Sequence, residues 1–252
     1  MILFSSCLLR TLMATRWAVA WRWGGATRIA QTVSILIFLS VLPASAFTES
    51  DLQKYLGWNK GFSSADSIIA SWPKTELFYN SLGGQSGAVN DLISEYFFQI
   101  SQRTGVSITR QYSGHIDIAI VVDNNVLIDL HDKTWRFRTL GLHDSYILSM
   151  KNTNPRPDAP GGVYCAREFF SSDNNDIRFA IVMSQNTSRA CIVGGILGAM
   201  GIKASEGASD IEMLNMACVI YAARHLGART MSEILKNKEK LEVACDERNW
   251  AK

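Results

Sequence analysis

The stretch Cys191–Ile202 constrains the fold most, because its apolar side chains recur at helical spacing although three glycines fall inside it. Each glycine inside a helix costs roughly 1 kcal/mol relative to alanine. A helix here must gain its stability from packing, and the spacing of Gly194 and Gly198 would let a neighbouring backbone approach closely. The sequence predicts a buried helix that rests on another element through its glycines.

The same glycines stand where one class of enzyme carries its chemistry. In a metalloprotease helix of the H-E-x-x-H kind, two histidines four residues apart bind zinc and the glutamate after the first is the general base. On that template, Gly194 and Gly198 occupy the ligand positions and Gly195 occupies the position of the base. Glycine can fill neither role. We expect no catalytic residue, no metal and no cofactor at this helix; the alternative is that the glycines serve close packing alone.

Residues 1–46 have the features of a secretory signal. They contain four arginines but no lysine, aspartate or glutamate, and an apolar run over 33–42 is followed by Ala44-Ser45-Ala46. A basic segment, an apolar segment and a small-residue cleavage pattern are typical of export signals. The run is about half the ~20 residues that a membrane span needs. We expect cleavage before Phe47, a periplasmic or secreted protein, and no retained transmembrane segment.

Removal of this signal changes the charge of the chain. The sequence has 25 basic and 23 acidic residues, and the four arginines of the signal leave 21 basic residues, a net charge of −2. No basic stripe with interleaved aromatic residues remains, so nucleic acid is not an expected partner. Residues 47–252 are sufficient for one domain with a hydrophobic core.

Four cysteines remain after residue 46, and an even number in an exported chain favours two disulfides. Four cysteines allow three connectivities. We favour Cys165 with Cys191, which would tie a strand to the glycine-containing helix, and Cys218 with Cys245, which would tie two successive helices. A zinc site is the alternative, but no C-x-x-C pair occurs and the spacings are wide.

Apolar periodicity and capping signals place the elements. The second long helix opens at a capping box, Ser209-x-x-Glu212, and the last opens at another, Thr230-x-x-Glu233. Besides the glycine-containing helix, the sequence predicts helices over 51–57, 88–103, 211–226 and from 230 to about 245, and strands over 75–79, 116–122, 162–170 and 176–183. The expected fold class is α+β, with a small mixed or antiparallel sheet packed with helices and a helical C-terminal half.

A short Leu-His-Asp sequence occurs twice in the centre of the chain and gives two His-Asp pairs, His131-Asp132 and His143-Asp144. Such a pair can supply a base with its orienting carboxylate, or metal ligands. Adjacent residues on a strand face opposite sides, which favours a surface or structural role. A hydrolase that uses His143 and Asp144 is the alternative function.

The C-terminal part resembles the exported bacterial domain-of-unknown-function 2927 family, which is regarded as zincin-like. The family's helix has the form C-L-x-E-E-L-x-Q-x-L-G-L, and Cys191–Ile202 matches its cysteine, its apolar positions and its terminal Gly-aliphatic pair. A second segment, L-Y-D-P-R-L-x-x-G-M, is matched at Tyr221, Arg224 and Met231, but its Asp-Pro is absent. The polar positions of the family's helix are Gly194, Gly195 and Gly198 here.

The resemblance implies a zincin-like domain over residues 47–252 with a degenerate active-site helix, and it implies no activity. We expect an exported, disulfide-stabilised pseudoenzyme that acts as a binding or structural module of the cell envelope. Its partner would be a protein, a peptide or an envelope glycan.

Overall fold

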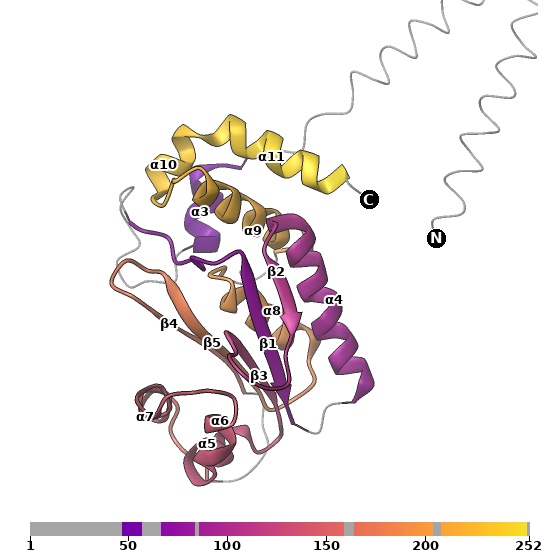
Figure 1. Cartoon of the computed structure of the whole chain (residues 1–252), viewed down its shortest axis with the longest axis vertical. Coiled ribbons are helices and arrows are strands. Elements are labelled where there is room, and N and C mark those ends of the chain that lie inside the picture. The colour runs from indigo at the N-terminus through magenta and orange to yellow at the C-terminus, as the bar shows by residue number, and fades with distance from the viewer. Residues whose placement is uncertain (1–46, 57–66, 84–85, 159–163, 204–207, 251–252) are drawn as a thin grey trace, which may run out of the picture. The chain divides into compact units, whose positions relative to one another are not determined.

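The central sheet of this computed structural model is mixed: β2, β1, β3 and β5 run parallel, and the edge strand β4 is antiparallel to β5 (Figure 1). The structure describes residues 47–56, 67–83, 86–158, 164–203 and 208–250, without the side chains of 247–250. The predicted signal, 1–46, lies outside the described residues. Among these residues the strands are β1 (Glu76–Leu82), β2 (Ser107–Arg110), β3 (Ile118–Val122), β4 (Cys165–Ser171) and β5 (Ile177–Ser184).

Helices cover both faces of this sheet. One hydrophobic cluster joins Ile118, Ile120 and Val182 to α4, α8 and α9, whereas a second joins Val121 and Ile181 to the short helices α5–α7. Figure 1 shows the two groups on opposite sides of the strands. The helices are α3 (Glu49–Leu56), α4 (Gly87–Thr104), α5 (Val126–Asp132), α6 (Thr134–Arg138), α7 (Asp144–Thr153), α8 (Arg189–Ala199), α9 (Asp210–His225), α10 (Met231–Lys236) and α11 (Lys238–Trp250).

The strand β3 is buried along its whole length, and this follows from its position. Parallel strands require crossover connections, and the helices of those connections cover the sheet faces. Here α4 connects β1 to β2, and α5–α7 lie between β3 and β4. A strand covered on both sides carries a continuous apolar run, as Ile118–Val122 does.

The ends of several helices follow the predicted capping chemistry. Ser209 and Glu212 form a reciprocal capping box at α9, and Thr230 and Glu233 form one at α10. Gly105 ends α4 in the left-handed conformation, with φ of 74°. These local signals fix the helix boundaries independently of the tertiary fold.

The structure adds elements that the sequence reading did not place. These are the strand β2 and the helices α5–α7, and the last predicted helix divides at Asn237 into α10 and α11. Of the two sheet types expected, the mixed one is present. The α+β class and the helical C-terminal half are confirmed, and the described residues from Phe47 onward form one compact unit. In that part of the chain no helix is both long and apolar enough to cross a membrane.

Candidate functional site

The glycines of α8 face the sheet at close range. Gly194, Gly195 and Gly198 are all buried. A Cβ atom at Gly195 would overlap Cγ1 of Val182 on β5, and one at Gly198 would overlap Cδ of Arg167 on β4. The helix therefore lies against β4 and β5 at a distance that larger residues would prevent, which is the close-packing role expected from the sequence.

Arg167 of β4 extends over the part of α8 where the template would carry its ligands. Its Nη1 lies 3.5 Å from the carbonyl oxygen of Gly194, and its Nε would lie 3.1 Å from a Cβ at Gly198. Burial lowers the pKa of the Arg167 guanidinium, but arginine remains protonated in proteins. The immediate neighbourhood of these positions thus contains a cation, backbone carbonyls and aliphatic groups.

Two cysteine pairs tie this region together. Cys165 and Cys191 are bonded with their Cα atoms 5.7 Å apart, and Cys218 and Cys245 are bonded at 5.8 Å. Both distances are ordinary for disulfides. The first pair connects β4 to α8 beside the glycines, and the second connects α9 to α11. These are the pairs favoured from the sequence.

The residues that carry the family resemblance around α9 hold the carboxyl end of α8. The Tyr221 hydroxyl donates to the Met200 carbonyl at 3.1 Å, and the Trp72 indole N–H donates to the Ala199 carbonyl at 2.8 Å. Burial raises the pKa of Tyr221 above its usual range. Arg224 donates to Ser71 and to Asp176, each at 2.7 Å. Tyr221 therefore holds the carboxyl end of α8, whereas Arg224 connects α9 to Ser71 and to Asp176, which precedes β5.

His143 and Asp144 have different hydrogen-bond partners. The Arg138 Nε–H donates to the Asp144 carboxylate at 2.7 Å, and this bond holds the pKa of Asp144 below its usual range. His143 precedes α7, and its Nδ1 lies 3.3 Å from the Ser145 hydroxyl. The imidazole thus contacts a hydroxyl instead of the carboxylate that the sequence pattern suggested.

The remaining histidines lie in separate places. The His131 Nε2–H donates to the Asn154 carbonyl at 2.8 Å, which is a structural contact. His225 lines a cavity of about 250 Å³ together with Trp72 and Lys74. None of the four histidines is among the nearest neighbours of Gly195 or Gly198.

His115 and His143 line one cavity of about 460 Å³, which we call the two-histidine cavity. It lies at the amino ends of β3, β5 and α7. The sequence does not predict this cavity, because its walls come from three distant segments and no local spacing marks it. Its lining residues are Gly114, His115, Ile116, Gly141, His143, Ser145, Tyr146, Arg178 and Phe179.

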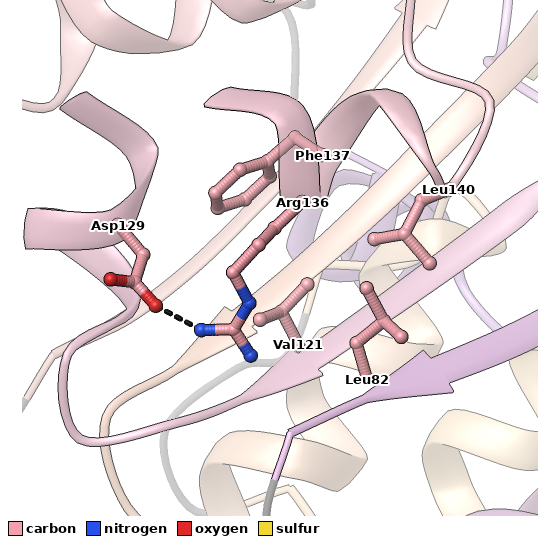
Figure 2. Close-up of a pocket in the computed structure, with 6 residues that line it drawn as sticks. All are labelled: Leu82, Val121, Asp129, Arg136, Phe137 and Leu140. Carbon is pink, nitrogen blue, oxygen red and sulfur yellow. Dashed lines mark hydrogen bonds and ion pairs between the residues drawn. The ribbon is translucent and has the colours of Figure 1, made fainter. Parts of the chain in front are cut away.

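A much smaller void lies under α5 and α6, beside a buried ion pair (Figure 2). Its volume of about 10 Å³ leaves room for no more than one water molecule. Arg136 donates to the buried carboxylate of Asp129 and, at 3.1 Å, to Asp123. Lys133 pairs with the second oxygen of Asp129 at 2.9 Å. This cluster joins α5 to α6 and leaves no space for a ligand.

Comparison of the chain with protein-family models and with curated proteins finds no match.

Proposed function

We propose that the protein is an exported, disulfide-stabilised, zincin-like pseudoenzyme that acts as a binding or structural module of the cell envelope. One observation carries the proposal. At the three positions of α8 where an H-E-x-x-H helix would hold its ligands and base, the chain has buried glycines that pack on Val182 and Arg167.

Zinc is the metal that a zincin-like helix implies, and the residues of α8 do not fit it. Zinc is bound by thiolate, imidazole or carboxylate donors. Gly194 and Gly198 have no such donor, and the charged side chain beside them, Arg167, would repel a cation. Within the described ranges, no group of three or more His, Cys, Asp or Glu is placed to hold a metal. We assign no metal, cofactor or catalytic residue to α8.

The zincin-like class is supported by the motif resemblance together with the place of α8. This helix directly follows the parallel strand β5, and the antiparallel edge strand β4 runs beside it. The Cys165–Cys191 bond fixes that edge strand to the helix. Of the matched residues, Tyr221 donates to the Met200 carbonyl at the carboxyl end of α8, and Arg224 donates to Ser71.

Export is supported by the predicted signal over 1–46 and by the two cysteine pairs, which are compatible with an oxidising compartment. Partners of the proposed module are an envelope protein, a peptide or a glycan. With a net charge of −2 for residues 47–252, nucleic acid is not among them.

Peptidase activity tests the proposal. Residues 47–252, purified from an oxidising compartment, would be incubated with a mixed fluorogenic peptide library, with and without added zinc. We expect no cleavage above the rate of buffer in either case. Zinc-dependent cleavage that copurifies with the monodisperse protein and is lost on chelation would contradict the proposal.

A hydrolase that uses the two-histidine cavity is the second candidate function. It is favoured by the 3.3 Å contact between His143 Nδ1 and the Ser145 hydroxyl in a cavity that also holds His115. The test is hydrolysis of p-nitrophenyl acetate. If the wild type hydrolyses it, His143→Gln does not and the matched control His225→Gln does, this candidate replaces the pseudoenzyme.

A further inference from the structure

The side chains that line the two-histidine cavity and can carry a charge near neutral pH are all basic. It contains the side chains of His115, His143 and Arg178 and no acidic residue. Its volume of about 460 Å³ falls in the range of small-molecule sites, which is roughly 300–1,000 Å³. At neutral pH the Arg178 guanidinium carries a positive charge. The lining is therefore suited to an anionic ligand.

Arg178 is directed to this cavity by an irregularity of the sheet. Phe170 pairs with Phe179 and Ser171 pairs with Ile177, so Arg178 is an extra residue on β5 without an opposite partner on β4. Bulges of this kind redirect side chains. Arg178 is exposed and lines the cavity beside the buried Phe179, and no hydrogen-bond or ion-pair partner for its guanidinium occurs in the described part of the chain. Five guanidinium N–H donors are thus available to a ligand.

His115 is oriented by a fully buried carboxylate. Its Nε2 lies 2.8 Å from Asp117, whose side chain also accepts from Lys74 at 2.6 Å and from the Phe78 backbone N–H at 2.9 Å. Because Lys74 balances the negative charge of Asp117, this carboxylate does not cancel the positive charge of the cavity. The remaining nitrogen of His115, Nδ1, takes no part in these bonds.

The side of the cavity formed by the start of α7 combines polar hydrogen-bond donors with aromatic rings. His143 and Ser145 lie at the start of α7, where the first backbone N–H groups of a helix have no intrahelical acceptor. The adjacent Tyr146 ring is stacked on Phe170, with their ring centroids 4.0 Å apart, and lies over Phe179 at 6.1 Å. This stack gives the cavity one flat, rigid apolar surface.

We propose that the two-histidine cavity is a binding site for a small ring compound that carries an oxyanion, such as a phosphate, sulfate or carboxylate. The oxyanion accepts hydrogen bonds from Arg178 and from the Nε2–H of His143, His115 lines the same site, and the ring packs on Tyr146. The site uses none of the α8 residues, so it does not depend on the proposed pseudoenzyme.

Titration calorimetry with four probes tests this assignment: phenyl phosphate, benzoate, inorganic phosphate and phenol. We expect phenyl phosphate or benzoate to bind more tightly than inorganic phosphate, and phenol to bind most weakly, because only the first two combine charge and ring. The comparison of phenyl phosphate with benzoate identifies the preferred oxyanion. Absence of binding by both charged ring compounds at about 10 mM, a concentration at which millimolar affinity is readily measured, would overturn the proposal.

Arg178→Gln is the decisive variant, and Arg156→Gln is its matched control, because Arg156 is an exposed arginine that pairs with Asp132 away from the cavity. Loss of a charge-assisted hydrogen bond corresponds to an affinity loss of roughly tenfold or more. We expect this loss in Arg178→Gln and unchanged affinity in Arg156→Gln. If both variants bind as the wild type does, the ligand occupies another place and the assignment is wrong.

Histidine resonances provide a test that needs no variant. On addition of phenyl sulfate, whose charge is constant near neutrality, the imidazole signals of His115 and His143 should shift while those of His131 and His225 remain. Shifts confined to His131 or His225 would contradict the proposal.

Discussion

Alanine at Gly195 and at Gly198 should have different effects on stability, although both positions are buried on the same helix. In each case alanine gains roughly 1 kcal/mol of helix propensity over glycine. At Gly195 the new Cβ would overlap Val182, a β-branched side chain fixed in the central part of the fold. Overpacking of this kind costs about 1–3 kcal/mol, so we expect Gly195→Ala to be destabilised by about 1 kcal/mol net.

At Gly198 the new Cβ would meet the Arg167 side chain, whose several rotatable bonds let it move aside. The cost is smaller there, and we expect Gly198→Ala to be neutral or stabilised by up to about 1 kcal/mol. For a domain of this length, 1 kcal/mol corresponds to about 2–4 °C in Tm. Thermal and urea denaturation of the two variants should therefore separate them by several degrees, with Gly195→Ala the less stable.

A double-mutant cycle with Val182→Ala shows whether the overlap is the cause. Removal of the valine methyl groups should relieve the strain, so that Gly195→Ala costs less in the Val182→Ala background than in the wild type. Additive effects in this cycle, or a Gly195→Ala variant as stable as Gly198→Ala, would refute the close-packing argument for α8.

Three further predictions concern the elements around this helix. Replacement of both Cys165 and Cys191 by serine should lower the free energy of unfolding by about 3.5 kcal/mol in the chain-entropy model, given the separation of 26 residues. Urea titration measures this loss, and a loss near zero would contradict the prediction. Arg136→Leu leaves the carboxylate of Asp129, which is 2 % exposed, without its main partner. This variant should lower the free energy of unfolding, measured from the denaturant midpoint, by about 3–5 kcal/mol. An additional Asp129→Leu should restore part of this stability, and a double variant no more stable than Arg136→Leu would contradict the prediction. The backbone N–H of Arg229, with the N–H and hydroxyl of Thr230, holds the pKa of Glu233 below 4.5. The contribution of Glu233 to stability is therefore complete above pH 4.5 and is lost as the pH falls through the lowered pKa. Glu233→Gln should remove that part of the acid sensitivity and the control Glu95→Gln should not, so equal acid denaturation profiles for the wild type and Glu233→Gln would contradict this prediction.

The parts of the fold that were predictable depend on local chemistry. The apolar spacing within Gly87–Thr104 defines one buried helix face, and reciprocal side-chain bonds mark the starts of α9 and α10. In contrast, β2 has only four residues, none of them fully buried, and it is stabilised by parallel pairing with β1. The short helices α5–α7 likewise depend on packing against β3 and β5 more than on their own periodicity.

The candidate sites likewise include one that local sequence indicates and one that depends on tertiary packing. The glycines of α8 could be recognised because their chemistry and spacing are both local. His143 and Asp144 are neighbours in sequence, but their side chains have different hydrogen-bond partners, Ser145 and Arg138, which the sequence alone does not indicate. The two-histidine cavity depends on a bulge that redirects Arg178 and on the alignment of three segments at one sheet edge. Neither feature has a signature in a single stretch of sequence.

The metal content of residues 47–252, purified from an oxidising compartment without chelator, tests the central claim most directly. Elemental analysis, supported by equilibrium dialysis against micromolar zinc, would give the stoichiometry per chain. Because glycines and Arg167 stand where ligands would be required, we expect far less than one equivalent of zinc. One tightly bound equivalent would contradict the account, because it would require ligands outside α8 and would restore a metalloenzyme as the leading hypothesis.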